Sequence, residues 1–346
     1  DGASTLPDAF TYNRTPVALS SNPVIGDAQG GTKVTVIGEG FQLNNEGATV
    51  VLVNGEEASN VEVVDDETLT FDAPSANADD IAVALDIEIE TANGNTGLEE
   101  AFTYIRPGLL FGQSRGDGGL DGFGIYFYDL PTNRSTKLFS LPNGTARIVL
   151  DAQGSITYRG NNQGGINGRR SLFAVDPLTG DFEFRGPLTQ DNNARAISGL
   201  TRVGNRVIAI NRDQNDMAEV DLQTGQMTSL GINPPDTRAC ILERNADEVF
   251  HIRGLGQAIN ILNLQTGDVT IGASFNGELP DVNNLNEVRC HGITRFGGEV
   301  FAAFNDRNVG NRPTFLFRVD LESGAINLVD DRVGSIGGLI ATPPNL

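Results

Sequence analysis

The sequence predicts an all-β protein, in which a β-sandwich is followed by a five-bladed β-propeller that the C-terminal strand closes. Amphipathic helical periodicity is almost missing, whereas apolar and polar residues alternate in many short stretches, as in residues 81–90 (IAVALDIEIE). Turns rich in Gly, Asn and Asp separate these stretches. Two kinds of internal repeat then divide the chain, one near the N-terminus and one over residues 107–346.

The composition limits the class of partner. The 346 residues include 24 Lys and Arg against 45 Asp and Glu, a formal net charge of -21. Because so acidic a protein repels nucleic-acid phosphates and anionic membranes, we expect neither nucleic acid as a partner nor membrane insertion. No apolar run reaches the roughly 18 residues that span a bilayer. The chain starts at Asp1 rather than Met, so we expect a processed product or a fragment.

A short repeat marks the N-terminal region. Residues 6–12 read LPDAFTY and residues 98–104 read LEEAFTY, so we assign residues 1–15 to the closing strand of a preceding or neighbouring module. Two interpretations stay open. The parent chain has further modules upstream, or residues 1–12 complete the sheet of a neighbouring subunit, as donated strands do in fibres. Head-to-tail donation would make the protein a self-polymerising filament subunit.

The full copy of this module covers residues 16–105. Gly30-Gly31 makes a tight turn before an alternating strand, and Gly38 and Gly40 permit a bend before Phe41 enters the core. Further motifs are Asn22-Pro23, Val53-Asn54-Gly55, the TFDAPSA stretch and the closing AFTY. Together these residues resemble the IPT/TIG family. The resemblance implies an immunoglobulin-like sandwich that serves as a spacer or interaction module.

A strand–turn–strand unit recurs in residues 106–346, which we assign to the propeller. Its turn begins at equivalent positions, namely Asp129, Asp176, Asp221, Asn263 and Asp320. These positions lie 42 to 57 residues apart, which is the size of a four-stranded blade. Asp or Asn before such a turn accepts a hydrogen bond from the backbone two residues on. The pattern resembles the broad family of propellers with D-x-x-T-G repeats, a resemblance that implies a fold and no function.

The first unit lacks one leading strand. The C-terminal residues IGGLIATPP, around Leu339, match ISGLTRVG, around Leu200. We therefore expect the C-terminal strand to be the innermost strand of the first blade, which closes the ring and removes its free sheet edges.

Arginines recur just before the predicted innermost strands. Aligned blades place Arg195, Arg238 and Arg289 within one position of each other, with Arg147 two positions away and His291 beside them. Such a ring at one mouth of the channel would bind carboxylate, sulfate or phosphate bidentately. His291 would add a titrating donor. In the alternative, the arginines pair with acidic neighbours and close the channel.

The two cysteines, Cys240 and Cys290, lie near the innermost strands of adjacent blades. They form either a disulfide that joins blades four and five, which suits an oxidising compartment, or two buried free thiols. We favour the disulfide.

Asp117 and Asp121 in the loop RGDGGLDGFG are candidate ligands of Ca²⁺, the one possible cofactor that the sequence indicates. Because no regular calcium-loop spacing is present, a solvated turn is the favoured interpretation there.

The sequence contains few residues or motifs that indicate catalysis. Neither His251 nor His291 has metal-ligand spacing around it, and no nucleophile elbow, zinc motif, P-loop or dinucleotide fingerprint occurs. Asp151, Glu243 and Asp247 are carboxylates that would face the channel of a propeller hydrolase, but Asp and Glu are too common here to single them out. We therefore expect no enzymatic activity.

These observations predict a non-catalytic extracellular or cell-surface protein, of bacterial origin. It would be an adhesin or a subunit of an extracellular filament, and its partners would be copies of itself, other surface proteins or glycans. Two alternatives stay open. One is a propeller module that binds an anionic glycan, and the other is a propeller lyase or hydrolase.

Overall fold

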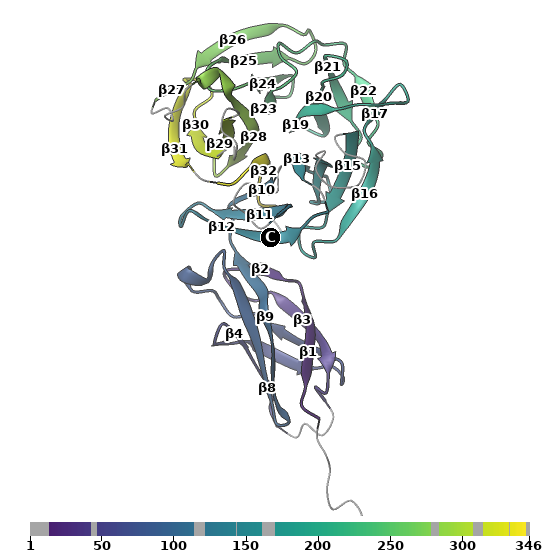
Figure 1. Ribbon diagram of the computed structural model, residues 1–346, viewed down its shortest axis with the longest axis vertical. Coiled ribbons are helices and arrows are strands. Elements are labelled where there is room, and N and C mark those ends of the chain that lie inside the picture. The colour runs from purple at the N-terminus through teal and green to yellow at the C-terminus, as the bar shows by residue number, and fades with distance from the viewer. Residues whose placement is uncertain are drawn as a thin grey trace, which may run out of the picture. The chain divides into compact units, whose positions relative to one another are not determined.

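The computed structural model describes residues 14–42, 47–113, 122–142, 144–160, 170–277, 284–306, 314–331 and 333–343. The chain divides into two compact units, residues 1–106 and 107–346. In the described part, regular structure is almost entirely strand, and the named helices are the 3-10 turns η1 (Ala78–Asp80) and η3 (Leu285–Glu287) (Figure 1). The predicted all-β class is therefore confirmed.

The first unit is a sandwich of two sheets. One sheet has the order β1 (Val17–Asn22), β3 (Lys33–Glu39), β7 (Thr68–Asp72), β6 (Ser59–Val63). The other has the order β2 (Ile25–Asp27), β9 (Gly94–Ile105), β8 (Ala84–Thr91), β4 (Val50–Val53), β5 (Glu56–Glu57). Alternate residues of the strands fill the space between the sheets, because successive side chains of a strand point to opposite faces. Val34 and Val36 of β3, with Ile87 and Ile89 of β8, are fully buried in this way.

The closing strand of this unit, β9, is paired along both edges. It contains the predicted LEEAFTY sequence and lies parallel to β2 and antiparallel to β8. A bulge shifts the β8–β9 register between Leu85 and Ile87, and Glu100 has a φ of 49° there. Residues 1–13, which carry the first copy of the sequence, lie outside the described residues, and so does the strand predicted for them.

Within the described residues, the second unit contains a two-stranded sheet and five larger sheets, each with four main strands ordered from the centre outward, which we number as blades 1 to 5. Blade 1 is β32 (Ile336–Ala341), β10 (Leu109–Gln113), β11 (Gly124–Asp129), β12 (Arg134–Ser140), and blade 2 is β13 (Thr145–Leu150), β14 (Ile156–Gly160), β15 (Ser171–Val175), β16 (Phe182–Pro187). Blade 3 is β19 (Ile197–Val203), β20 (Arg206–Asn211), β21 (Asp216–Val220), β22 (Met227–Ser229), and blade 4 is β23 (Cys240–Asn245), β24 (Glu248–Ile252), β25 (Ala258–Asn263), β26 (Val269–Ser274). Blade 5 is β28 (Val288–Phe296), β29 (Glu299–Asp306), β30 (Thr314–Val319), β31 (Ala325–Asp330).

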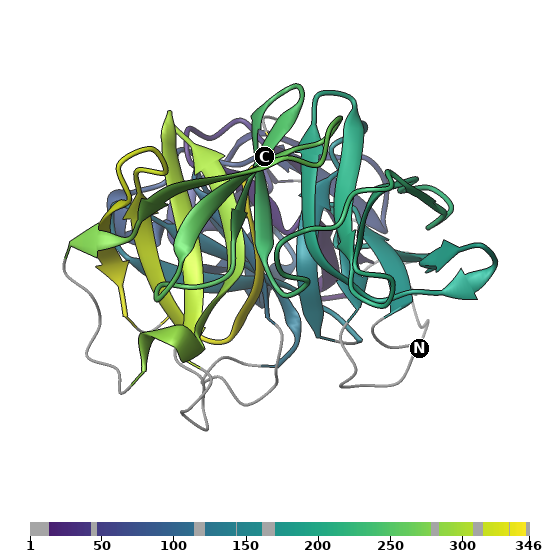
Figure 2. The same cartoon turned by 90° about the horizontal axis from the view of Figure 1, so that it is seen from above.

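Three short strands complete the unit. β27 (Asn276–Gly277) pairs parallel with β31, and β17 (Thr189–Gln190) forms a small hairpin with β18 (Asn193–Ala194). The blades are arranged in a ring with their first strands innermost (Figure 1), and the edge-on view shows strands of several blades standing roughly upright (Figure 2). The immunoglobulin-like sandwich and the propeller are thus both present.

The C-terminal strand closes the ring, as the sequence predicts. β32 pairs antiparallel with β10 from Leu109↔Ala341 to Gln113↔Ile336 and is the innermost strand of blade 1. Since β10 follows the first unit and β32 ends the chain, blade 1 joins the two ends of the propeller sequence. Closure leaves the ring without an open gap between its first and last blades.

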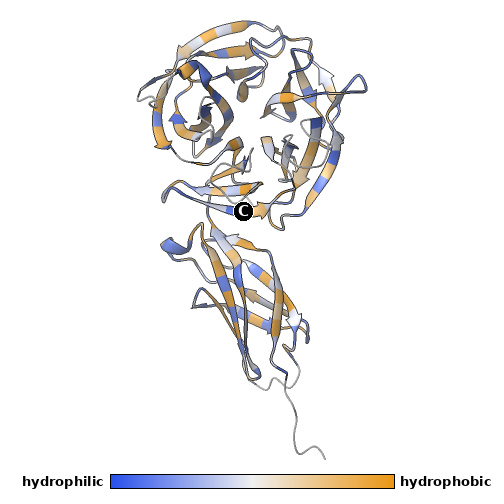
Figure 3. Ribbon diagram, viewed as in Figure 1, coloured by the Kyte–Doolittle hydropathy of each residue, from blue (hydrophilic) through white to orange (hydrophobic). Residues whose placement is uncertain are grey.

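The repeated turn residues define the outer hairpin of each later blade. The side chains of Asp176, Asp221, Asn263 and Asp320 each accept a hydrogen bond from the backbone N–H two residues on, over 2.7 to 2.9 Å. A glycine with positive φ follows in each turn, at positions 180, 225, 267 and 324. Hydrophobic and hydrophilic residues alternate along the outer strands (Figure 3), so one side of each strand packs against a neighbouring blade.

Candidate functional site

The innermost strands of all five blades line one mouth of the central channel. The cavity there has a volume of about 260 Å³. Its floor is an aliphatic collar with one residue from each blade, namely Leu339, Ile148, Leu200, Leu242 and Ile293. Arg202, Glu243 and Arg295 line the same cavity. The mouth is therefore an apolar depression with charged side chains around it.

Beneath the collar, Arg147 fills the channel. Its Nη1 donates to the backbone carbonyl of His291 and lies 3.5 Å from Sγ of Cys240. These partners belong to blades 4 and 5, which do not adjoin blade 2, so the side chain reaches across the axis. Arg147 has a φ of 66°, a conformation uncommon for a residue other than glycine. The remaining cavity beside these groups has a volume of only about 20 Å³.

Cys240 and Cys290 are brought together at this level as buried free thiols. The predicted disulfide is therefore not formed in this structure, and the alternative of free thiols describes it. Burial raises the pKa of the Cys240 thiol, but the hydrogen bond from Cys290 and the charge of Arg147 lower it by more. Burial and the interaction with Cys240 raise the pKa of Cys290. The sequence thus predicted that both cysteines lie near the innermost strands of adjacent blades, but it did not decide between a disulfide and two free thiols.

Two of the remaining arginines of the predicted ring, Arg289 and Arg195, have local partners. Arg289 is 8% exposed, and its Nη2 lies 3.6 Å from Glu287. Arg195 donates to the side-chain oxygen of Gln214 at 2.6 and 3.2 Å. Arg238 is exposed on the loop before β23. Arg147 thus lies inside the channel, Arg289 is buried and Arg238 is exposed, and anion binding by this set of residues stays a prediction.

The other predicted groups make turn and packing contacts. Asp151 accepts from the backbone N–H of Gln153 and Ser155, and Glu243 accepts from that of Gly204 at 3.0 Å. His251 is a packed strand residue, 1% exposed, whose Nε2 lies 2.8 Å from the carbonyl of Asp236. Burial lowers the pKa of His251.

The predicted calcium ligands Asp117 and Asp121 lie outside the described residues. Among the residues that are described, no group of three or more His, Cys, Asp or Glu side chains is placed to hold a metal ion. In the same part of the chain, no helix is long and apolar enough to cross a membrane.

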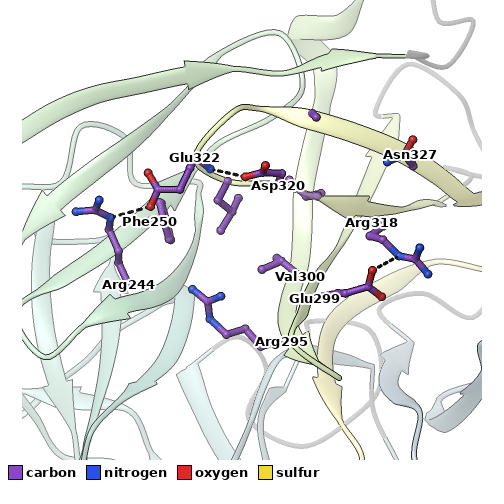
Figure 4. Close-up of a pocket in the computed structure, with 13 residues that line it drawn as sticks. Arg244, Phe250, Arg295, Glu299, Val300, Arg318, Asp320, Glu322 and Asn327 are labelled. Carbon is purple, nitrogen blue, oxygen red and sulfur yellow. Dashed lines mark hydrogen bonds and ion pairs between the residues drawn. The ribbon is translucent and has the colours of Figure 1, made fainter.

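A second pocket, which we call the Arg295 pocket, lies between blades 4 and 5 and has a volume of about 390 Å³ (Figure 4). Arg244 and Phe250 line it from blade 4, and the other lining residues come from blade 5. Its deep side is apolar, formed by the buried side chains of Phe250, Val300, Val319 and Leu321. Its rim carries charged residues of both signs, namely Arg244, Arg295, Arg318, Glu299, Asp320 and Glu322.

Most charges on this rim are neutralised within the protein. Arg244 Nε lies 3.3 Å from Glu322, and Arg318 Nε lies 3.1 Å from Glu299. Arg295 differs, because its Nη2 donates to the uncharged backbone carbonyl of Glu243 at 3.2 Å. Figure 4 shows its guanidinium on the side of the pocket that faces Arg244 and Phe250. No ion pair of Arg295 is found within the described part of the chain.

Arg295 lines both the channel mouth and the Arg295 pocket, so the two cavities meet at this side chain. Arg202 holds the equivalent place in blade 3, where its Nη2 donates to the carbonyl of Leu150 at 2.7 Å. The pocket beside Arg202, of about 630 Å³, has this single arginine against three carboxylates, whereas the Arg295 pocket has three arginines against three carboxylates. Of the two, the Arg295 pocket is therefore better suited to an anion.

Sequence reasoning missed these arginines although a signal was present. The aligned blades read LTR, LER and ITR at residues 200–202, 242–244 and 293–295. The repeated arginine follows the collar residue by two positions. The predicted arginine ring lies at the start of the innermost strands, whereas these arginines lie toward their far ends.

Comparison with known proteins identifies the first unit. Residues 16–104 match the model of the IPT/TIG domain family, which confirms the resemblance seen in the sequence. A search of curated protein sequences found no match.

Solved structures similar to the chain share little sequence with it. An auxiliary nutrient binding protein from Bacteroides ovatus has 14% identity and a TM-score of 0.37, over 91% of this chain and 86% of that protein. A chain of a nidogen/laminin complex has 11% identity and a TM-score of 0.43, over 68% and 98%. A catalytically inactive virginiamycin B lyase from Staphylococcus aureus, solved with quinupristin, has 13% identity and a TM-score of 0.34, over 92% and 89%. At such low similarity these likenesses carry no argument about function, and the propeller assignment rests on the sheet order.

Proposed function

We propose that this protein is a non-catalytic binding protein of the cell surface or extracellular space, whose propeller holds an anionic saccharide in the Arg295 pocket. The IPT/TIG unit acts as a spacer that presents the propeller. The observation that carries the proposal is the guanidinium of Arg295, which projects into a pocket while its charge is balanced by no carboxylate within the described residues.

The charge pattern favours an anion at this position. A chain with a net charge of -21 repels anions over long distances, so an anionic ligand needs a local cation. The Asp320 carboxylate accepts hydrogen bonds from the backbone N–H groups of Glu322 and Ser323 in its own turn. It is therefore engaged locally and does not form an ion pair with Arg295. The planar guanidinium still has N–H groups to offer a ligand carboxylate or sulfate in bidentate geometry.

The shape of the pocket favours a sugar-sized ligand. Its volume of about 390 Å³ falls within the range of small-molecule sites, roughly 300–1,000 Å³. The apolar floor at Phe250 and Val300 contacts the faces of a sugar ring, and the carboxylates of Glu299 and Glu322 accept hydrogen bonds from its hydroxyls. Arg295 would bind the carboxylate of a uronic acid, and the carboxylates of Glu299 and Glu322 would accept hydrogen bonds from its hydroxyls. A neutral sugar has no carboxylate for Arg295, so a uronic acid fits the pocket better.

Calorimetric titration of the full chain with uronic-acid oligosaccharides tests the proposal, with the corresponding neutral oligosaccharides as the comparison. Arg295→Gln should weaken binding of the acidic series at least tenfold, since charged hydrogen bonds contribute about 1.5–3 kcal/mol. Arg206→Gln is the matched control, because its guanidinium reaches the carbonyl of Ala246 away from this pocket.

Equal binding of acidic and neutral sugars, or an Arg295→Gln variant that binds as well as the Arg206→Gln control, would overturn the assignment of the pocket. Cleavage of the oligosaccharides during the titration would overturn the non-catalytic part alone. The two failures are distinguishable by chromatography of the recovered sugar.

Assembly through a donated strand is the competing hypothesis, and the first unit offers it little support. A donated copy of LPDAFTY would take the position of LEEAFTY, but β9 already fills that position between β2 and β8. A neighbouring copy of this chain would have to lose its own β9 first. Electron microscopy of the native protein checks this hypothesis, which predicts long unbranched fibres.

A further inference from the structure

The two thiols beneath the collar belong to strands that are hydrogen-bonded to the same segment. Cys240 of β23 lies opposite Ile252 of β24, and the next residue, Arg253, accepts a hydrogen bond from the N–H of Cys290 at 2.9 Å. An isolated bridge joins Gly254 to Arg289 beside it. The backbones of blades 4 and 5 are therefore fixed to each other where the thiols meet.

The surroundings make the two sulfur atoms chemically different. Sγ of Cys240 lies 3.5 Å from Nη1 of Arg147, whose positive charge favours a thiolate at this sulfur. Sγ of Cys290 points toward the carbonyl of Gly292 at 3.6 Å, a contact that suits a protonated thiol. A thiolate beside a neutral thiol is the arrangement in which one sulfur attacks and the other resolves.

We propose that Cys240 and Cys290 are a redox-active dithiol, which a small hydroperoxide oxidises to a disulfide that joins blades 4 and 5. The Cys240 thiolate attacks the peroxide, its sulfur is oxidised to a sulfenic acid, and the O–O bond breaks to release hydroxide or alkoxide. The Cys290 thiol then displaces the sulfenic oxygen, which leaves as water once the thiol proton is transferred. The net reaction consumes two thiols and one hydroperoxide and gives one disulfide, one water and one water or alcohol.

The size of the adjoining cavity selects the oxidant. A volume of about 20 Å³ is enough for roughly one water molecule, so only a very small oxidant can approach the thiols. Hydrogen peroxide, with two heavy atoms, is the smallest hydroperoxide, whereas a bulky disulfide reagent is excluded. Closure of the disulfide also removes the thiolate that faces Arg147, so the side chain that crosses the channel loses one partner. The redox state of the pair is thereby connected to the group that fills the channel.

The test uses the full chain, reduced and freed of reductant, then treated with an equimolar amount of hydrogen peroxide. Intact-mass measurement should show loss of two hydrogens, and peptide mapping should place the new bond between Cys240 and Cys290. The melting temperature of the propeller should rise by about 5 °C, because the bond closes a long loop. Native protein should react slowly with a bulky aromatic disulfide.

Variants separate the proposed chemistry from simple proximity. Arg147→Asn, whose side chain tolerates positive φ, should oxidise about tenfold more slowly, since the thiolate fraction falls about tenfold for each unit by which the pKa rises. Arg206→Asn is the control and should react at the rate of the unchanged chain. Cys290→Ser should accumulate a sulfenic acid on Cys240, detected by intact-mass measurement as the gain of one oxygen atom. Failure to react with peroxide, oxidation to sulfinic acid or to intermolecular dimers in the unchanged chain, or equal rates in both arginine variants would overturn the proposal.

Discussion

Arg147 and His291 are joined across the axis of the propeller, since Nη1 of the arginine donates to the backbone carbonyl of the histidine. The two residues belong to the innermost strands of blades 2 and 5, which are separated by blade 1 on one side and by two blades on the other. The hydrogen bond therefore ties together parts of the ring that no strand pairing connects. It also explains why the channel is nearly closed beneath the aliphatic collar.

Removing this link should destabilise the propeller. Arg147→Asn keeps a residue that tolerates positive φ, so the main loss is the hydrogen bond to a carbonyl inside the channel, which costs about 1–2 kcal/mol. Calorimetry of the full chain should show the propeller transition lowered and the transition of the first unit unchanged. An unaltered propeller transition would mean that the arginine adds no stability.

Close approach of blades 5 and 1 depends on a glycine. A Cβ on Gly292 would lie 2.7 Å from both the backbone nitrogen and the Cβ of Leu339, and the backbone atom cannot move away cheaply. Gly292→Ala should therefore lower the free energy of unfolding of the propeller by about 1–3 kcal/mol. Gly47→Ala is the control, because its nearest contact is a side-chain atom of Ala92 at 3.2 Å. Chemical denaturation compares the two, and equal losses would contradict the proposed reason.

Burial of His251 makes stability depend on pH. Its pKa is lowered in the folded state, so the unfolded chain binds the proton more readily, and stability is lost as the pH falls below the ordinary value of 6.5. The loss is limited to about 1.4 kcal/mol for each pH unit. His251→Gln keeps a donor for the carbonyl of Asp236 and should remove this part of the dependence between pH 7.5 and 5.5. His291→Gln, which changes the other histidine of the chain, should retain it, as melting curves at both pH values will show.

Asp216 is a buried carboxylate that we expect to lower the stability of the fold. It is 7% exposed, and within the described residues neither oxygen has a hydrogen-bond partner. Because an unpaired buried charge is unfavourable, Asp216→Asn should raise the free energy of unfolding by about 1 kcal/mol. Asp221→Asn is the matched control, since its exposed side chain accepts from the turn at Gln223 and Thr224 and gains nothing from neutrality. A loss of stability in the Asp216 variant would show that the carboxylate is needed in the fold.

The sequence indicated the site only in part. The position of Cys240 and Cys290 on adjacent innermost strands was predictable, because the blade repeat gives each residue a register. Whether their thiols join or stay free was not, because that depends on local geometry and on Arg147 from a distant blade. The Arg295 pocket was also not predicted, although the repeated arginine was visible in the sequence. Only the three-dimensional structure shows which carboxylates form ion pairs with which arginines. Glu322 and Arg244, for example, are 78 residues apart in the sequence.

The sequence by itself determined the local structure of this protein. Alternation of apolar residues fixes which face of a strand is buried, and the Asp or Asn with its following glycine fixes each outer hairpin, because both depend on neighbours within a few residues. The matching stretch around Leu339 even predicted how the ring closes. Only the tertiary structure decided which charges remain unbalanced and what fills the channel. Arg147, Cys240 and His291 come from three blades, and side chains that meet across a ring axis leave no periodic signal in the chain.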